Sequence, residues 1–164
     1  MSTVKITPSR GVKKTAEVAV RVQGLSKVYA SAAELLPVLT DIDFELHTAR
    51  SLAVIGESGS GKSTLLNLVG GLDYASSGSI TIFGTSIETM NETELARFRN
   101  RHVGFVFQYH HLLPDFSAIE NVAMPALLAG RSFEEARETA RQLLVDIGLG
   151  TRLEHRPGQL SGGE

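Results

Sequence analysis

Alternating apolar and polar residues indicate the first strands of the chain. Residues 18–22 and 42–46 both alternate in this way, and a period of two is typical of a strand with one buried face. The polar, alanine-rich stretch between them, residues 30–37, predicts a loop. A short continuous apolar run at residues 51–55 predicts a strand buried on both faces.

Two further strands and four helices follow. Apolar residues predict strands at residues 78–83 and 103–107, and a helix at residues 62–69 immediately after a glycine-rich turn. The other three helices are indicated by capping boxes, in which a small polar residue stands three positions before a glutamate. These pairs are Asn91 with Glu94, Ser117 with Glu120, and Ser132 with Glu135.

The order of these elements predicts a fold of the α/β class. Antiparallel strands come first, then a strand–loop–helix unit, then further strands, and finally helices. We therefore expect an α/β core with an N-terminal antiparallel β-subdomain and an added α-helical subdomain. Residues 1–17 are polar and basic and lack the apolar segment of a signal peptide, which predicts a flexible N-terminal extension.

Composition and charge narrow the possible functions. The chain has 164 residues, of which 42% are hydrophobic and 21% charged, as in ordinary globular domains. Its formal net charge of −2 provides no basic field for direct contact with nucleic acid. Because the chain has no cysteine, a disulfide scaffold and a cysteine-bound zinc site are excluded. No apolar run is long enough to span a bilayer, so we expect any contact with a membrane to occur through a partner.

The glycine-rich turn after residues 51–55 matches the phosphate-loop pattern G-x-x-x-x-G-K-[ST], which predicts a P-loop NTPase core. Glycines let backbone amides wrap around a phosphate, and the following helix adds its positive N-terminal end. Lys62 supplies a charge for the β- and γ-phosphates, the Ser63 hydroxyl is a ligand for Mg²⁺, and Thr64 caps the helix or contacts the α-phosphate side. The alternative, a chance glycine-rich loop, is disfavoured by the strand before it and the helix after it. The predicted nucleotide contacts are Gly56, Glu57, Ser58, Gly59, Ser60, Gly61, Lys62, Ser63 and Thr64.

A second motif closes the chain and consists of Leu160, Ser161, Gly162, Gly163 and Glu164. By itself it predicts only a turn. Together with the phosphate loop it resembles the signature of the ABC ATPases. The resemblance covers residues 18–164 and implies that they form a partial nucleotide-binding domain. In that family Ser161 would open a helix whose amides face the γ-phosphate of ATP bound by another subunit. The resemblance thus implies a homodimer that encloses ATP.

Two single residues match further positions of the ABC ATPase pattern. Tyr29 stands where the family places an aromatic ring against adenine, and stacking accounts for the residue type. Gln108 follows residues 103–107, where the family has a glutamine that reaches Mg²⁺ and the attacking water. The resemblance implies a catalytic role for Gln108 and a link to the helical subdomain at about residues 109–164. An ordinary strand-end tyrosine and a solvated loop glutamine are the alternatives.

The segment after Gln108 indicates one subgroup of this family. Residues 109–125, Tyr-His-His-Leu-Leu-Pro-Asp-Phe-Ser-Ala-Ile-Glu-Asn-Val-Ala-Met-Pro, resemble the ATPase subunits of bacterial lipoprotein-releasing systems, as do residues 70–73 and 155–157. That resemblance implies a peripheral ATPase on the cytoplasmic face of the inner membrane, which works with integral membrane permease subunits. ATPases of macrolide-type efflux and cell-division complexes share several of these features and are the alternative.

Within this segment, two groups of side chains have open interpretations. His110 and His111 are adjacent, and adjacent side chains usually point apart, so packing or partner contact is favoured over metal binding. Leu112, Leu113 and Phe116 lie where the family docks its membrane subunit, or else belong to the core of the helical lobe.

The resemblance also implies residues beyond Glu164. ABC ATPases continue to an aspartate that orients Mg²⁺, a glutamate that acts as general base, and a switch histidine. Without them we expect this chain to bind nucleotide weakly, to hydrolyse none usefully and to be marginally stable. A non-hydrolysing regulator that binds nucleotide is a remaining alternative. A soluble ABC protein acting on ribosomes or DNA would need an inserted coiled coil or a second cassette, which the spacing between Ser63 and Leu160 does not show.

Overall fold

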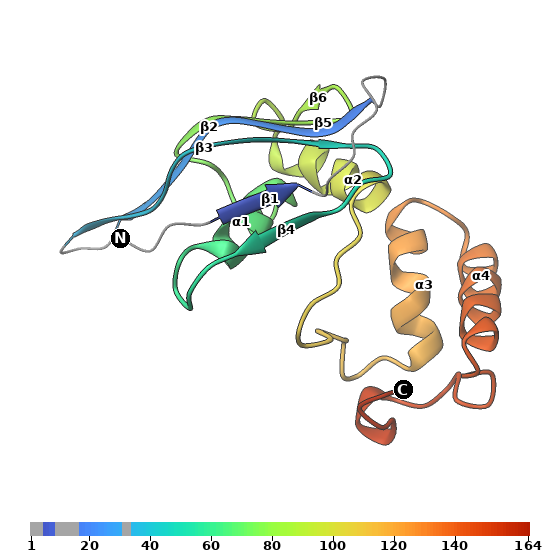
Figure 1. The fold of residues 1–164 in the computed structure, drawn as a ribbon. Coiled ribbons are helices and arrows are strands. Elements are labelled where there is room, and N and C mark those ends of the chain that lie inside the picture. The colour runs from blue at the N-terminus through green and yellow to red at the C-terminus, as the bar shows by residue number, and fades with distance from the viewer. Residues whose placement is uncertain (1–4, 9–16, 31–33) are drawn as a thin grey trace. The chain divides into compact units, whose positions relative to one another are not determined.

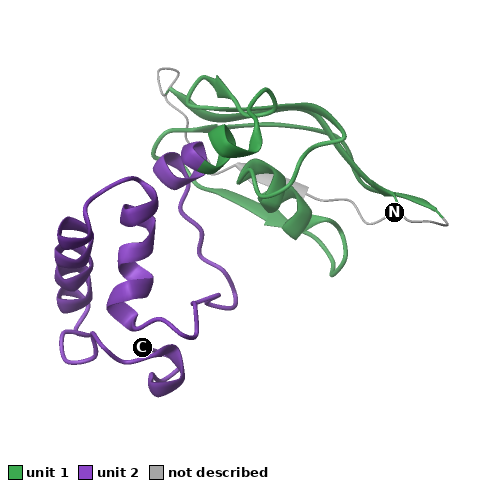
Figure 2. Cartoon of the chain, turned by 180° about the vertical axis from the view of Figure 1, so that it is seen from behind, with its two compact units in different colours: residues 1–96 green, residues 97–164 purple. Residues whose placement is uncertain are grey.

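The computed structural model describes residues 5–8, 17–30 and 34–164. The chain forms two compact units, residues 1–96 and residues 97–164, and the division falls within helix α2 (Figure 2). The strands are β1 Lys5–Pro8, β2 Val18–Ala30, β3 Leu35–His47, β4 Leu52–Ile55, β5 Ser77–Ile82 and β6 Thr85–Ser86. The helices are α1 Lys62–Val69, α2 Glu92–His102, α3 Ala118–Leu128, α4 Phe133–Asp146 and the short 3₁₀ helix η1 Pro157–Gln159.

A four-stranded antiparallel sheet with the strand order β3-β2-β5-β6 forms much of the first unit (Figure 1). Val22 and Leu25 on β2 are almost completely buried and form the centre of its core. Gly78 on β5 has a φ of +90°, and a Cβ placed on it would lie 2.4 Å from the carbonyl oxygen of Gly24. Only glycine therefore allows β5 to approach β2 this closely.

The β2–β3 hairpin is longer than the sequence pattern predicted. The loop expected at residues 30–37 is wrong in its bounds, because Ala30 pairs with Leu35 at the end of the hairpin. Register shifts between Val18 and Val20, between Val22 and Leu25, and again as far as Val28 interrupt the period of two along β2. Ala19 is buried as well as Val22, although the sequence pattern placed the two residues on opposite faces.

A separate two-stranded sheet joins β4 to β1, with Lys5 opposite Ile55 and Pro8 opposite Leu52. The sequence predicted a flexible extension over residues 1–17, and the structure places a strand within it. Pairing with β1 gives the backbone amides and carbonyls of one edge of β4 their hydrogen-bond partners. The prediction that β4 is buried on both faces is wrong: Ile55 is 57% exposed, and β1 is the one strand beside β4 in the described part of the chain.

The strand predicted at residues 103–107 is not formed. These residues have no regular secondary structure, and Val106 is fully exposed. The rings of Phe105 and Phe107 stack on each other with centroids 5.3 Å apart. A strand needs a hydrogen-bonded neighbour as well as apolar residues, and among the described residues none pairs with this segment.

The helices agree closely with the sequence pattern. α1 begins and ends at the predicted residues. Ahead of α2, the amide of Asn91 donates to the Glu94 carboxylate and the amide of Glu94 donates to the Asn91 side chain, both at 3.0 Å. The capping boxes that open α3 and α4 are also formed. These predictions succeed because a capping box is a local interaction over four residues.

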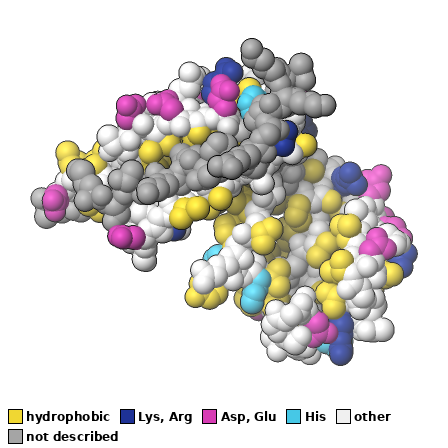
Figure 3. Space-filling model, in the orientation of Figure 1, with side chains coloured by type: hydrophobic (Ala, Val, Ile, Leu, Met, Phe, Trp, Pro, Cys, Tyr) yellow, Lys and Arg dark blue, Asp and Glu magenta, His cyan; other side chains and the backbone are white. Residues whose placement is uncertain are grey.

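The second unit has its core between α3 and α4. The buried residues are mostly alanines, which let the two helices approach closely. They are Ala118, Ile119, Ala123, Ala136, Ala140 and Leu144. Many larger hydrophobic side chains are exposed, and Figure 3 shows such side chains as yellow patches on the surface. Among the helices that the structure describes, none combines the length and the apolar character that a membrane-spanning helix needs.

Candidate nucleotide-binding site

The phosphate-loop residues 56–61 connect the end of β4 to the start of α1, as the motif requires (Figure 1). Gly61 lies directly before the helix with a φ of 93° and a ψ of 7°, a left-handed conformation. A Cβ on Gly61 would lie 3.0 Å from the carbonyl oxygen of Val38 on β3. Both the backbone conformation and the lack of space therefore demand glycine here.

The N-terminus of α1 is suited to an anion. Its first helical hydrogen bond runs from the amide of Leu65 to the carbonyl of Gly61, at 2.8 Å. The amides of residues 62–64 thus have no partner inside the helix, and no side chain of the described residues caps this end. The capping role considered for Thr64 is therefore not formed. Ser63 is exposed in the same turn, so its hydroxyl is accessible to a cation bound beside phosphates.

Lys62 folds back over the loop that precedes it. Its Nζ donates to the carbonyl oxygens of Gly56 at 2.9 Å and of Glu57 at 2.5 Å, and lies 3.4 Å from the Ser60 hydroxyl. The ammonium group is therefore held over the loop that leads into α1. Positive charge from the side chain and from the helix end coincides at this point, which is the electrostatic requirement for a polyphosphate.

Tyr29 is held by two residues for which the sequence pattern indicates no function. Its hydroxyl donates to Asp73 Oδ2 at 2.8 Å. Lys27 Nζ donates to Asp73 Oδ1 at 2.8 Å and lies 4.7 Å from the centroid of the Tyr29 ring. Asp73 ends the Gly-Gly-Leu-Asp run, and Lys27 lies two residues before Tyr29. The sequence pattern alone does not predict that these two residues contact Tyr29.

Asp73 is a charged centre within this cluster. Burial raises the pKa of its carboxyl. Hydrogen bonds from Lys27, Tyr29 and the amide of Tyr74 lower the pKa by more than burial raises it, so the pKa of Asp73 lies below its ordinary value. The Lys27 side chain is only 11% exposed, against 29% for that of Asp73. The two residues therefore form a largely buried ion pair at neutral pH.

Strand β3 connects Tyr29 to the phosphate loop. Tyr29 is paired with Leu36 on β3, whereas Gly61 packs against Val38 of the same strand. Two residues along a strand correspond to about 7 Å. Tyr29 is 41% exposed, so the structure places an accessible aromatic ring close to the loop on the same unit.

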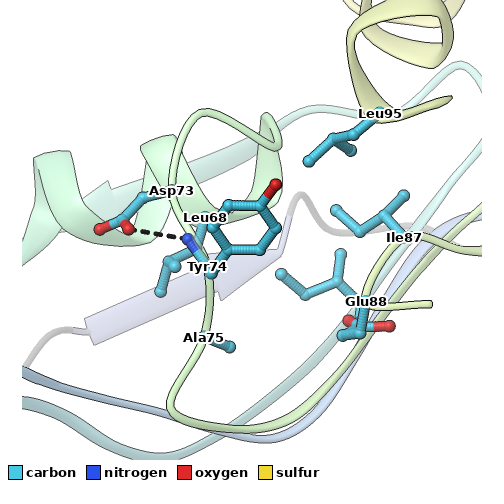
Figure 4. A pocket seen from close by; sticks show the side chains of 8 residues that line it. Leu68, Asp73, Tyr74, Ala75, Ile87, Glu88 and Leu95 are labelled. Atoms are coloured by element: carbon cyan, nitrogen blue, oxygen red, sulfur yellow. Dashed lines mark hydrogen bonds between the residues drawn. The ribbon is translucent and has the colours of Figure 1, made fainter. Parts of the chain in front are cut away.

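A pocket of about 90 Å³ behind Tyr74 is not the nucleotide site. It is lined mainly by apolar side chains, including Leu68 of α1, Ile87 and Leu95, and Figure 4 shows the Tyr74 ring among them. Pockets for ligands of drug size usually have about 300 Å³ or more. The pocket is therefore too small for a nucleotide.

Gln108 and the signature residues belong to the second unit. Gln108 is exposed in the irregular segment that follows residues 103–107. Residues 161–164 form a turn, with the Glu164 amide donating to the Ser161 carbonyl at 3.1 Å. The Glu164 carboxylate accepts from the Ser161 amide at 2.9 Å, and hydrogen bonds from that amide and hydroxyl lower the pKa of Glu164. Residues 161–164 thus form one turn, in which the Glu164 carboxylate binds the amide of Ser161.

Of the two adjacent histidines, His111 contacts an aromatic ring. His111 contacts the ring of Phe107 edge to face, with centroids 4.9 Å apart. Its φ of 47° marks a tight bend in the chain. Within the described residues, no group of three or more histidine, aspartate or glutamate side chains is placed to hold a metal ion.

The sequence pattern that describes the ABC transporter family matches residues 39–164. The chain belongs to this family. Its fold is that of the ABC ATPase cassettes. The ATP-binding cassette MJ0796, solved as a dimer in a post-hydrolysis state bound to ADP and Pi, is similar with a TM-score of 0.72 and 31% sequence identity. That match covers 88% of this chain and 64% of the other.

Individual members of the ABC transporter family are more similar still. The lipoprotein-releasing system ATP-binding protein LolD of Hahella chejuensis is 54% identical over 142 residues, which cover 87% of this chain and 62% of the relative. The protein of the same name from Idiomarina loihiensis is 54% identical over 144 residues, which cover 88% of this chain and 63% of the relative. The chain thus spans less than two thirds of the length of these relatives.

Proposed function

We propose that this chain is the nucleotide-binding part of an ATP-driven motor that releases lipoproteins from the inner membrane. The observation that carries the proposal is the uncapped N-terminus of α1 beneath a glycine-rich loop, with the Lys62 ammonium beside it. Identity of 54% to lipoprotein-releasing ATP-binding proteins supports this cargo over that of the efflux and cell-division relatives.

The predicted residues of the nucleotide site have separate roles in this proposal. The amides of residues 56–61 and the first turn of α1 bind the phosphates, and Lys62 pairs with the β- and γ-phosphates. The Ser63 and Gln108 side chains would hold Mg²⁺, which would neutralise part of the phosphate charge when it is bound. Gln108 also orients the attacking water, and Tyr29 stacks on the adenine.

The proposed assembly is a homodimer on the cytoplasmic face of the inner membrane. Ser161 and the amides of Gly162 and Gly163 contact the γ-phosphate bound by the second copy, and integral membrane permease subunits receive the motion. The dimeric state of the ADP-bound cassette MJ0796 supports the proposed homodimer. The relatives' name, a lipoprotein-releasing system, supports the proposed work with permease subunits at the membrane.

A chimera tests the proposal. Residues 18–164 of this chain replace the aligned segment of LolD from Hahella chejuensis, in cells depleted of their own lipoprotein-releasing ATPase. We expect the chimera to restore growth and the release of lipoproteins from spheroplasts, and the same chimera with Lys62→Ala to restore neither. A chimera that is produced in normal amounts and hydrolyses ATP, yet releases no lipoprotein, would contradict the proposed cargo.

A further inference from the structure

The Tyr29 side chain is restrained at its hydroxyl and over its ring. At its tip, the hydroxyl donates to Asp73 at 2.8 Å, and Lys27 lies over the ring, 4.7 Å from its centroid. Lys27 itself is fixed by hydrogen bonds to Asp73 at 2.8 Å and to the carbonyl of Tyr74 at 2.7 Å. The ring orientation is therefore set by a closed network of three side chains rather than by Tyr29 alone.

The backbone beside Tyr29 is fixed by the same segment. The Ser76 hydroxyl accepts from the amide of Val28 at 3.0 Å and donates to the carbonyl of Val28 at 3.3 Å. The amide of Ser76 donates to the carbonyl of Ser26 at 2.9 Å. Residues 73–76 thus hold the end of β2 along its length, on the edge opposite β3.

This segment is also connected to the phosphate loop. α1 begins at Lys62 and ends at Val69, only four residues before Asp73. At the start of the helix, Gly61 packs against Val38 of β3, two residues along from the partner of Tyr29. The helix that presents its amides to phosphates therefore leads directly into the residue that holds the ring.

We propose that Lys27 and Asp73 are positioning residues that hold the Tyr29 ring for stacking on the base of a nucleoside triphosphate. The inference rests on the proposed function, in which the triphosphate lies at the loop of residues 56–61. A ring that is ordered before binding loses little conformational entropy on stacking, so more of the stacking free energy contributes to affinity. The ammonium covers one part of the ring, and the 41% exposure of Tyr29 leaves surface for a base.

The test compares ATP with inorganic tripolyphosphate, which has the phosphates but no base. Isothermal titration calorimetry gives both dissociation constants for the 164-residue chain in the presence of Mg²⁺. Each substitution removes part of what orders the ring and so part of the stacking contribution. We therefore expect Asp73→Ala, Lys27→Met and Tyr29→Phe each to reduce the preference for ATP by about fivefold. The affinity for tripolyphosphate is expected to stay unchanged.

Two features separate positioning from a general structural effect. Tyr29→Phe keeps the ring and removes only the hydroxyl, so the double variant with Asp73→Ala is expected to lose no more preference than Asp73→Ala alone. Glu45→Gln is the matched control, because it removes an ion pair with Arg21 on the same two strands, remote from Tyr29 along the register. This control is expected to leave both affinities unchanged.

The possible results distinguish the inference from the function on which it rests. If the variants weaken ATP and tripolyphosphate equally, Lys27 and Asp73 act on the fold and the inference is wrong. If the wild-type chain binds tripolyphosphate without preferring ATP, the phosphate site stands and the inference is again wrong. If it binds neither, the proposed function fails first.

Discussion

At the scale of single residues, the phosphate loop depends on a backbone conformation that only glycine adopts easily. Gly59 and Gly61 both have positive φ angles, of 78° and 93°. They differ in their surroundings, because a Cβ on Gly61 would meet Val38 and Leu39, whereas nothing lies within 4 Å of a Cβ on Gly59. Substitutions at the two glycines therefore distinguish the cost of conformational strain from the cost of steric overlap.

Gly61→Ala is expected to destabilise the chain more than Gly59→Ala does. Both substitutions strain the backbone, at a cost of about 1–3 kcal/mol each. Only Gly61→Ala adds a contact of 3.0 Å with the backbone of β3, for which overpacking costs about 1–3 kcal/mol more. Urea unfolding measures the free energy of unfolding of each variant. Equal losses would show that β3 does not press on the loop as described.

The interaction of Lys27, Tyr29 and Asp73 shows the limit of prediction from sequence at this scale. The phosphate loop was predictable because eight consecutive residues carry it. Asp73 is 46 residues from Lys27 and 44 from Tyr29, and no local pattern connects them. The run containing Asp73 could be recognised as a family feature, but its contact with Tyr29 appears only in three dimensions.

At the scale of secondary-structure elements, local sequence signals predicted the helices correctly, whereas strand pairing could not be predicted. α1 and the three capping boxes involve residues within one or two turns, so the sequence specifies them directly. The pairing of β1 with β4 and the full length of the β2–β3 hairpin depend on distant partners and on bulges. Residues 103–107 have the composition of a strand but no strand neighbour in the described part of the chain.

The start of α3 depends on Asn121, which connects the helix to the loop before it. Its amide group donates to the carbonyls of Leu113, Phe116 and Ser117 at 3.0–3.1 Å, and its carbonyl accepts from the amide of Leu113 at 2.8 Å. No other side chain in the described residues is shown with as many backbone hydrogen bonds. Asn121 therefore fixes the shape of residues 113–117.

Asn121→Ala is expected to lower the free energy of unfolding by about 1–3 kcal/mol, because backbone groups lose their partners. Limited proteolysis should also cut the variant faster within residues 103–117. Gln142→Ala is the control, since Gln142 donates one exposed hydrogen bond to Asp146 on α4 and its loss is expected to cost less than about 0.5 kcal/mol. Similar effects of the two substitutions would refute the role assigned to Asn121.

At the scale of the whole molecule, the two units carry different residues of the ABC ATPase pattern. The first unit holds the phosphate loop and Tyr29, and the second holds Gln108 and the signature residues. The sequence predicted these parts and the family that combines them. The signature alone predicted only a turn, and the structure shows a turn, so its proposed contact with a second subunit depends on the family rather than on local geometry.

The binding of ATP at the loop of residues 56–61 is the central claim, and calorimetric titration of the wild-type chain and of Lys62→Ala with Mg-ATP tests it most directly. Arg21→Gln is the matched control, because it removes an exposed cation of the same unit. A hydrogen-bonded charge contributes about 1.5–3 kcal/mol, so Lys62→Ala is expected to weaken binding by about tenfold or more, and Arg21→Gln to leave it unchanged. Equal affinity of Lys62→Ala and the wild-type chain for Mg-ATP would contradict the account.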